Sequence, residues 1–137
     1  MIILDASAAV HIVLGTECGA AFRKLMLQGE YVATPHLFVS EIAQTFWKYA
    51  QAGAMTAKEA TIKAQEAYKL VDEFVADEKL MPEALHEAIA CDHSAYNMMY
   101  LVLARRKNAT LFTADSKLVA LCEAAGVDCV HSVSLGA

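Results

Sequence analysis

Short apolar segments alternate along this chain with longer segments of helical periodicity, and this alternation restricts the possible folds most strongly. Residues 2–4 and 109–112 are apolar and rich in β-branched or aromatic side chains, and a polar residue follows each of them. Such segments are typical of buried strands. Strands that are separated by helices form parallel sheets with helices on both faces. We therefore predict an α/β fold around a short parallel sheet.

The remaining elements follow from the same two periodicities. Further strands are expected at residues 31–34, 75–80 and 127–130, and helices at residues 7–13, 17–27, 37–52, 56–74, 83–90, 94–106 and 116–125. Gly53 separates two helices and predicts an antiparallel helical hairpin. Pro82 is expected to start the helix that follows it. The helix at 94–106 is apolar on nearly every side, so we expect it to be buried at the centre of the protein.

Length and composition favour one folded domain over residues 1–137. Of the 137 residues 57% are hydrophobic, which is well above the share that disordered chains have. No apolar run reaches the roughly 20 residues that span a bilayer, and the N-terminus lacks the basic segment of a secretory signal. The four cysteines form no C-x-x-C pair and are expected to be free thiols in a reducing cytoplasm.

The net charge of −5 argues mildly against a general nucleic-acid-binding protein, which is usually basic. It does not argue against a metal-dependent nuclease, because the site of such an enzyme is acidic and the bound cation reverses the local field.

Two acids stand directly behind predicted strands. Asp5 follows residues 2–4, and Asp115 follows residues 109–112 after a Thr113-Ala114 step. Open parallel sheets bind ligands beyond the carboxyl ends of their strands, so both acids are candidates for a site. Each could instead cap the helix that follows it, although Ser7 could cap the first helix in place of Asp5.

Three more polar residues are candidates. Glu41 lies in the first turns of a helix beside the apolar Ile42, where it either benefits from the helix dipole or belongs to a site. Asp92 lies at a helix junction and could be a cap. Asn97 lies inside a strongly apolar helix, where an amide without a partner costs about 1–3 kcal/mol, so we expect it to have a partner. Oxygen ligands of these types select Mg²⁺ or Mn²⁺ rather than zinc.

Four segments together resemble the PIN domain family, and within it the VapC-type toxins of VapBC toxin–antitoxin systems. Residues 3–7 (Ile-Leu-Asp-Ala-Ser) are similar to the family's opening strand and first acid, and residues 39–42 (Val-Ser-Glu-Ile) to its second acidic motif. Residues 96–104 and 111–118 resemble its third and fourth motifs. Each motif is loose by itself, but the four occur in the family's order over nearly the whole chain.

The resemblance implies a three-layer α/β/α sandwich and a Mg²⁺- or Mn²⁺-dependent endoribonuclease that cleaves RNA with metal-activated water. It also implies a homodimer and inhibition by an antitoxin. The acids expected to bind the metal are Asp5, Glu41 and Asp115. The amide of Asn97 and the carboxylate of Asp92 are expected to complete the metal site. The hydroxyls of Ser7 and Thr113 are expected to orient the acids. The family usually has Asp where this chain has Asn97.

This departure leaves a second hypothesis open. A neutral amide at position 97 brings no charge to a metal site, so the chain could be a catalytically weakened module that binds RNA or a protein. A third hypothesis, an aspartyl phosphatase, is disfavoured because Asp5-x-Ser7 lacks the second aspartate of such enzymes.

Two further features have alternative interpretations. The basic cluster at residues 105–107 either compensates a helix dipole or contacts RNA phosphates. Trp47 and Tyr49 either belong to the core or line an antitoxin groove.

Overall fold

A computed structural model describes residues 1–26 and 29–131, and its five strands form one parallel sheet. The strand order is β3-β2-β1-β4-β5, and the register pairs Ile3 with Ala33 of β2 on one side and with Leu111 of β4 on the other. The strands are β1 (Ile2–Leu4), β2 (Val32–Pro35), β3 (Glu73–Val75), β4 (Thr110–Thr113) and β5 (Cys129–His131). The predicted parallel α/β fold is confirmed.

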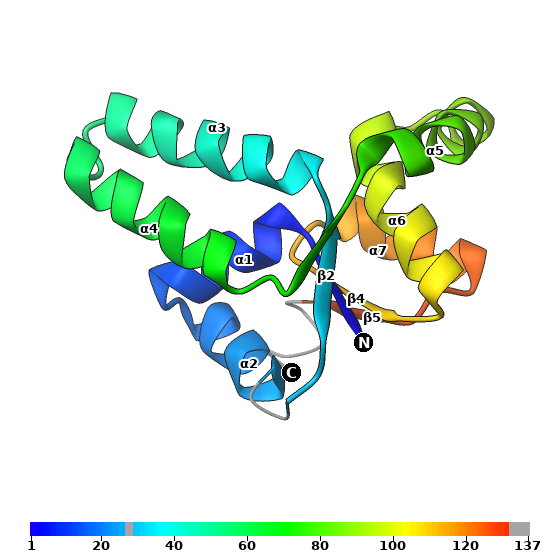
Figure 1. The fold of residues 1–137 in the computed structure, drawn as a ribbon, viewed down its shortest axis with the longest axis horizontal. Helices are drawn as coiled ribbons and strands as arrows, with labels where there is room; N and C mark the ends of the chain where they lie inside the picture. The colour runs from blue at the N-terminus through cyan, green and yellow to red at the C-terminus, as the bar shows by residue number, and fades with distance from the viewer. Residues whose placement is uncertain (27–28, 132–137) are drawn as a thin grey trace.

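Helices cover both faces of the sheet, which confirms the three-layer sandwich (Figure 1). The helices are α1 (Ala6–Leu14), α2 (Glu17–Met26), α3 (Leu37–Gln51), α4 (Ala57–Lys69), α5 (Asp77–Cys91), α6 (Ala95–Lys107) and α7 (Ser116–Ala125). Side chains alternate across a strand. Ile2 and Leu4 therefore join a core with α1 to α4, whereas Ile3 joins a second core with α5 to α7.

The helices α3 and α4 form the predicted antiparallel hairpin. Gly53 adopts a φ of +74° in the connection, a left-handed conformation that favours glycine. Thr56 and Glu59 form a complete capping box, in which the Thr56 hydroxyl accepts from the Glu59 backbone N–H at 3.1 Å. Local signals therefore determine where this hairpin turns.

Helix α6 is buried, as its apolar pattern predicted. It contacts β1, β2 and β4 as well as α5 and α7. Six of its residues are buried: Met98, Tyr100, Leu101, Val102, Leu103 and Ala104. Because this helix lies against the middle of the sheet, it carries its first turn to the carboxyl end of β1 and β4.

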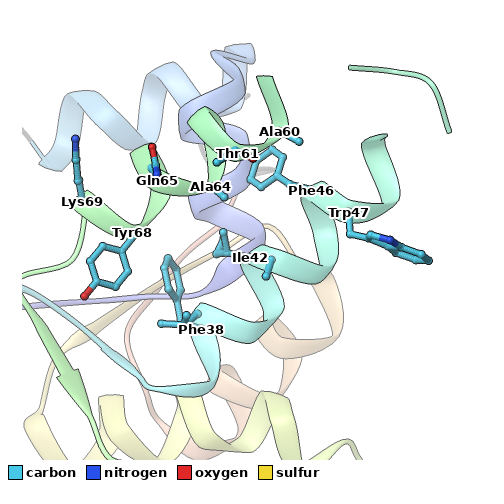
Figure 2. A pocket seen from close by; sticks show the side chains of 12 residues that line it. Phe38, Ile42, Phe46, Trp47, Ala60, Thr61, Ala64, Gln65, Tyr68 and Lys69 are labelled. Atoms are coloured by element: carbon cyan, nitrogen blue, oxygen red, sulfur yellow. The ribbon is translucent and has the colours of Figure 1, made fainter. Parts of the chain in front are cut away.

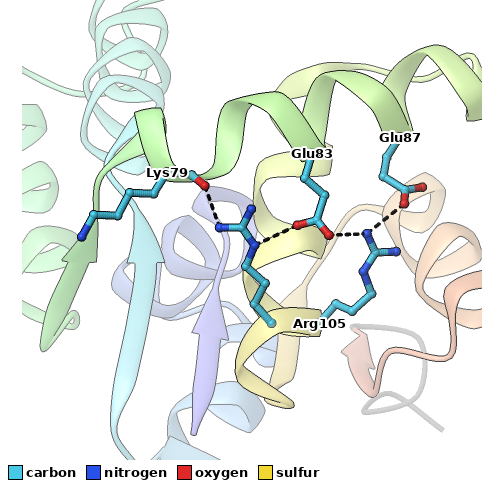
Figure 3. A network of polar contacts seen from close by, with 5 residues as sticks. Lys79, Glu83, Glu87 and Arg105 are labelled. Carbon is cyan, nitrogen blue, oxygen red and sulfur yellow. Dashed lines mark hydrogen bonds and ion pairs between the residues drawn. The ribbon is translucent and has the colours of Figure 1, made fainter.

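The basic cluster at the end of α6 is engaged with α5 (Figure 3). Arg105 donates to Glu83 at 3.0 Å and to Glu87 at 2.8 Å. Arg106 donates to Glu83 at 2.8 Å and to the backbone carbonyl of Lys79 at 2.6 Å. Both guanidinium groups therefore hold α5 against α6, and this favours a structural interpretation of the cluster over contact with RNA.

The segment between α4 and α5 differs from the sequence prediction. Helix α4 ends at Lys69 rather than at residue 74, and Phe74 lies in β3 because residues 73–75 pair with β2. The strand predicted at 75–80 is therefore wrong in its position. Helix α5 already begins at Asp77, so Pro82 lies inside the helix and not at its start. Tertiary pairing with β2 decides this boundary.

Other boundaries agree with the prediction or differ from it by one or two residues, and the predicted end of the second helix at residue 27 lies outside the described residues. No disulfide joins the cysteines in the described part of the chain, and Cys122 is the buried one. None of the described helices has the length and apolar character needed to cross a membrane.

Candidate active site

A cleft of about 660 Å³ opens at the carboxyl edge of the sheet, between α3 and α6. Its floor is the start of α1, where Asp5 and Ser7 lie. One wall comes from α3, in the layer of α1 to α4. The other wall comes from α6 and the start of α7, in the layer of α5 to α7. The acids Asp5, Glu41 and Asp115 all line this cleft, together with Asn97.

The cleft lies beside β1, where the chain stops adding strands on one side of the sheet and starts adding them on the other. After β1 the chain passes through α1 and α2 to β2 on one side, whereas β4 lies on the other side of β1. The two connections diverge above β1 and β4 and leave a crevice there, which is the usual ligand position in open α/β sheets. Asp5 and Asp115 follow these two strands, so the topology brings them to one place from opposite ends of the chain.

Asp5 is buried at 4% exposure and is fully engaged as the N-cap of α1. Its Oδ1 accepts from the Ser7 hydroxyl at 2.7 Å and from the Ala8 backbone N–H at 2.9 Å. Its Oδ2 accepts from the Thr113 hydroxyl. The cap role and the site role that the sequence left as alternatives therefore coincide in one carboxylate.

Burial raises the pKa of Asp5 from 3.8 to about 6. The hydrogen bonds from Thr113, Ala8 and Ser7 favour the ionised form and oppose this rise, and the nearby charge of Glu41 adds to it. The pKa is high because the effect of burial exceeds that of the three hydrogen bonds.

The Ser7 and Thr113 hydroxyls connect the ends of β1 and β4. Ser7 Oγ donates to Asp5 and accepts from the Ala114 backbone N–H at 2.9 Å. Thr113 Oγ1 donates to Asp5 and accepts from the Asp115 backbone N–H at 3.0 Å. The two hydroxyls thus orient Asp5 and also position the loop that carries Asp115.

Glu41 reaches the cleft from the first turns of α3 and accepts from the Tyr100 hydroxyl at 2.5 Å. Burial raises the pKa of Glu41; the Tyr100 hydrogen bond opposes the rise, and the charge of Asp77 adds to it. Burial and the adjacent Glu41 raise the pKa of Tyr100 well above its usual value, so its hydroxyl remains a donor.

Asn97 has a hydrogen-bond partner, as expected for an amide inside an apolar helix. Its Nδ2 donates to Asp115 Oδ2 at 3.1 Å, while Asp115 Oδ1 accepts from the Lys117 backbone N–H at 2.9 Å. The amide oxygen of Asn97 is the atom that remains for a cation. Asp92 is exposed at the C-cap of α5 in a left-handed conformation with φ of 50°, and it is not among the described residues that line the cleft.

Two residues of the cleft escaped the sequence reasoning. Asp77 Oδ1 accepts from the Leu37 backbone N–H at 3.0 Å, which joins the starts of α5 and α3. Asp77 follows β3 much as Asp5 follows β1, and this was the signal that an incorrect strand boundary concealed. Tyr100 lies in the segment 96–104 but was not a candidate site residue, and only its hydrogen bond to Glu41 reveals its role.

Comparisons with known proteins agree with this architecture. The PIN domain matches residues 2–124 of the chain. The chain belongs to the PIN domain family. No curated protein sequence matches it significantly.

Two solved structures have the same fold as this PIN domain. PAE2754 from Pyrobaculum aerophilum is 20% identical with a TM-score of 0.77, and the match covers 98% of this chain and 90% of that one. VapC20 from Mycobacterium tuberculosis, described as a toxin that cleaves the sarcin–ricin loop, is 17% identical with a TM-score of 0.64, and the match covers 88% of this chain and 95% of that one.

The donors of the cleft fit a hard divalent cation by type. They are carboxylate and amide oxygens, which suit Mg²⁺ or Mn²⁺. Within the described ranges, no three histidine, cysteine, aspartate or glutamate side chains already lie close enough to hold one ion. To share an ion, Asp5, Glu41 and Asp115 would therefore have to move closer together.

We predict that the unfolding free energy of Asp5→Asn, compared with that of the wild-type PIN domain at the same pH, increases as the pH rises. The folded-state pKa of about 6 lies above the ordinary 3.8, so wild type loses stability as the pH rises from about 4 through 6. Asparagine does not ionise. The difference in unfolding free energy should therefore shift in favour of the variant by roughly 2 kcal/mol between pH 4 and pH 7.5.

Urea unfolding at several pH values, without divalent metal, measures this difference. Asp92→Asn is the matched control, because it removes an exposed carboxylate outside the cleft and asparagine tolerates its left-handed backbone. Parallel stability curves for wild type and Asp5→Asn would contradict the buried ionisation of Asp5.

Proposed function

We propose that this PIN domain is a Mg²⁺- or Mn²⁺-dependent endoribonuclease that hydrolyses RNA phosphodiesters in the cytoplasm. The observation that carries the proposal is the convergence of Asp5, Glu41 and Asp115 from three separate elements on one cleft. Burial raises the pKa values of Asp5 and Glu41, and a neighbouring carboxylate adds to each rise, Glu41 at Asp5 and Asp77 at Glu41. Raised pKa values of this kind are expected of carboxylates arranged to bind a cation. Membership of a family of nucleases supports the same reaction.

In this proposal Asp5, Glu41 and Asp115 hold the ion, and the amide oxygen of Asn97 completes the set. When bound, a divalent cation neutralises phosphate charge and lowers the pKa of water so that it can attack phosphorus. The protein's other residues act on the carboxylates. Ser7 and Thr113 hold both oxygens of Asp5, and Tyr100 holds Glu41. Hydrogen bonds of this kind fix the direction in which a ligand points.

Cleavage of a mixed structured RNA tests the proposal. Purified protein should cut the RNA in Mn²⁺ or Mg²⁺ but not in EDTA, and Asp5→Asn should lower the rate at least about a hundredfold, because a charged ligand is lost. Gel electrophoresis of end-labelled RNA follows the products. Asp92→Asn should cut like wild type, since Asp92 lies outside the cleft. Intact RNA at high protein concentration would exclude the nuclease.

The weakened-module hypothesis remains the second candidate, and Asn97 is the observation that favours it. A neutral Asn97 already satisfies Asp115 through a hydrogen bond. An aspartate there would instead face Asp115 with like charge, which is unfavourable without metal.

Asn97→Asp separates the two hypotheses. We expect the variant to melt at a lower temperature without metal, to require less Mn²⁺ for half-maximal cleavage, and to gain less than about tenfold in maximal rate, because the other acids already supply the charge. Cleavage assays over a range of Mn²⁺ concentrations and thermal unfolding give these values. If wild type is inactive and Asn97→Asp cuts RNA, the chain is a weakened member.

We further propose that the protein is the toxin of a type II toxin–antitoxin pair, and that an apolar groove between α3 and α4 receives the antitoxin. The groove has a volume of about 690 Å³, and side chains of both helices line it, among them Ile42, Phe46 and Tyr68 (Figure 2). Trp47 is 55% exposed at its edge. An amphipathic helix fits such a groove.

The opposite sides of α3 line the groove and the cleft. Phe38, Ile42 and Phe46 line the groove, whereas Glu41, Gln44 and Lys48 line the cleft. An antitoxin helix in the groove would therefore contact the helix that carries Glu41, and this supports a partner that controls the site.

The homodimer is also part of the proposal. Helix α5 exposes the large apolar side chains Met81, Leu85 and Ile89 at intervals of four residues. This spacing puts them on one face of the helix, which is typical of a helix that packs against another chain.

Substitution of Trp47 tests the antitoxin groove. In cells that carry an antitoxin able to neutralise wild type, Trp47→Glu should prevent rescue of growth, because it places a charge at an apolar contact. RNA cleavage by the purified variant should stay unchanged, since Trp47 does not line the cleft. Ile62→Glu is the matched control, because Ile62 is exposed on α4 but does not line the groove. Rescue of Trp47→Glu would reject the groove.

A further inference from the structure

The charge of the cleft restricts how it can bind RNA. Asp5, Glu41, Asp77 and Asp115 line it, and Lys48 is the only cationic side chain among its described lining residues. The net charge of the protein is −5. Phosphate contacts, which usually dominate nucleic-acid affinity, are therefore scarce here. Binding of RNA beyond the scissile phosphate needs a contact that does not depend on positive charge.

Tyr96 provides such a contact. It lies in the first turn of α6, lines the cleft and is 67% exposed. The backbone is held at this point, because the Tyr96 N–H donates to the N-cap Ser94 hydroxyl at 3.2 Å and the next residue, Asn97, bonds to Asp115. An aromatic side chain on an anchored helix start is suited to stack on a base, since stacking tolerates any base and needs no charge.

Exposed aromatic residues are common on protein surfaces, but the others in the described part of the chain have other contacts. The Tyr31 hydroxyl donates to Glu73, and the Tyr68 ring stacks on Phe74 with the ring centres 5.0 Å apart. Trp47 lines the apolar groove. Among the described residues, Tyr96 is the exposed aromatic side chain that lines the acidic cleft, and its ring stacks on no neighbour there.

We propose that Tyr96 stacks on an unpaired base of the RNA, while Lys48 on the opposite wall binds the phosphate of a nearby nucleotide. The inference rests on the proposed function and assigns two side chains that hold the RNA beside the scissile phosphate. A base inside a duplex is already stacked on both sides, and its faces are not available to Tyr96. The cleft volume of about 660 Å³ lies within the usual range for ligand pockets, roughly 300–1,000 Å³.

Binding of labelled RNA, measured by fluorescence anisotropy, tests the proposal. The Asp5→Asn protein in Mn²⁺ is the background for each further variant, because it is expected to cut RNA at least about a hundredfold more slowly. A 12-nucleotide single strand should bind at least about tenfold more tightly than the same strand in a duplex. Tyr96→Ala should weaken single-strand binding about tenfold, the loss of one stacked base, and should leave duplex binding unchanged.

Two comparisons make this result specific. Tyr96→Phe should bind like the background protein, because the ring remains. Tyr31→Ala should do the same, because Tyr31 is exposed and does not line the cleft. Lys48→Gln should lower the slope of log affinity against log salt by about 0.7, the value for one phosphate contact with a single strand. Lys58→Gln should not change the slope, because Lys58 is exposed in the first turn of α4 and does not line the cleft.

The outcomes separate this inference from the nuclease proposal. Equal binding of both RNA forms, unchanged binding by Tyr96→Ala, or failure of Tyr96→Phe to bind would overturn the stacking contact even if wild type cuts RNA. If wild type does not cut RNA but single-strand binding still depends on the Tyr96 ring, the nuclease proposal fails and the stacking site stands.

Discussion

The buried carboxylate of Asp5 is the interaction on which this structure depends most. It caps α1 through the Ala8 N–H and accepts from the Ser7 and Thr113 hydroxyls. The same contacts join the ends of β1 and β4, which are far apart in sequence, and they position the loop that carries Asp115. Capping, the joining of two strands and the floor of the cleft are therefore one hydrogen-bond network, so a substitution at Asp5 changes stability as well as the site.

The cleft also shows how a stable scaffold can carry unfavourable charge. Burial raises the pKa values of Asp5 and Glu41, and the charge of Asp77 adds to the rise at Glu41. Such an arrangement lowers stability, and this cost is common at functional sites. The two apolar cores on either side of the sheet and the ion pairs between α5 and α6 offset this cost.

Much of the fold could be predicted because local patterns and tertiary structure agree over most of the chain. The strand at residues 2–4, the hairpin around Gly53 and the buried α6 all follow from periodicity and turn residues. The region from 69 to 82 could not be predicted in this way. There, pairing of residues 73–75 with β2 outweighs the helical pattern, and Pro82 is accommodated inside α5.

The sequence by itself determined which residues could form a site, because acids that follow strands of a parallel sheet must lie at its carboxyl edge. It did not determine their partners. Asn97 bonds to Asp115, and Tyr100 to Glu41, only because α6 packs against the sheet opposite α3. Contacts between side chains from different layers depend on how the layers pack, and no local pattern records that distance. The sequence therefore set the positions of the acids, and the tertiary structure decided which groups orient them.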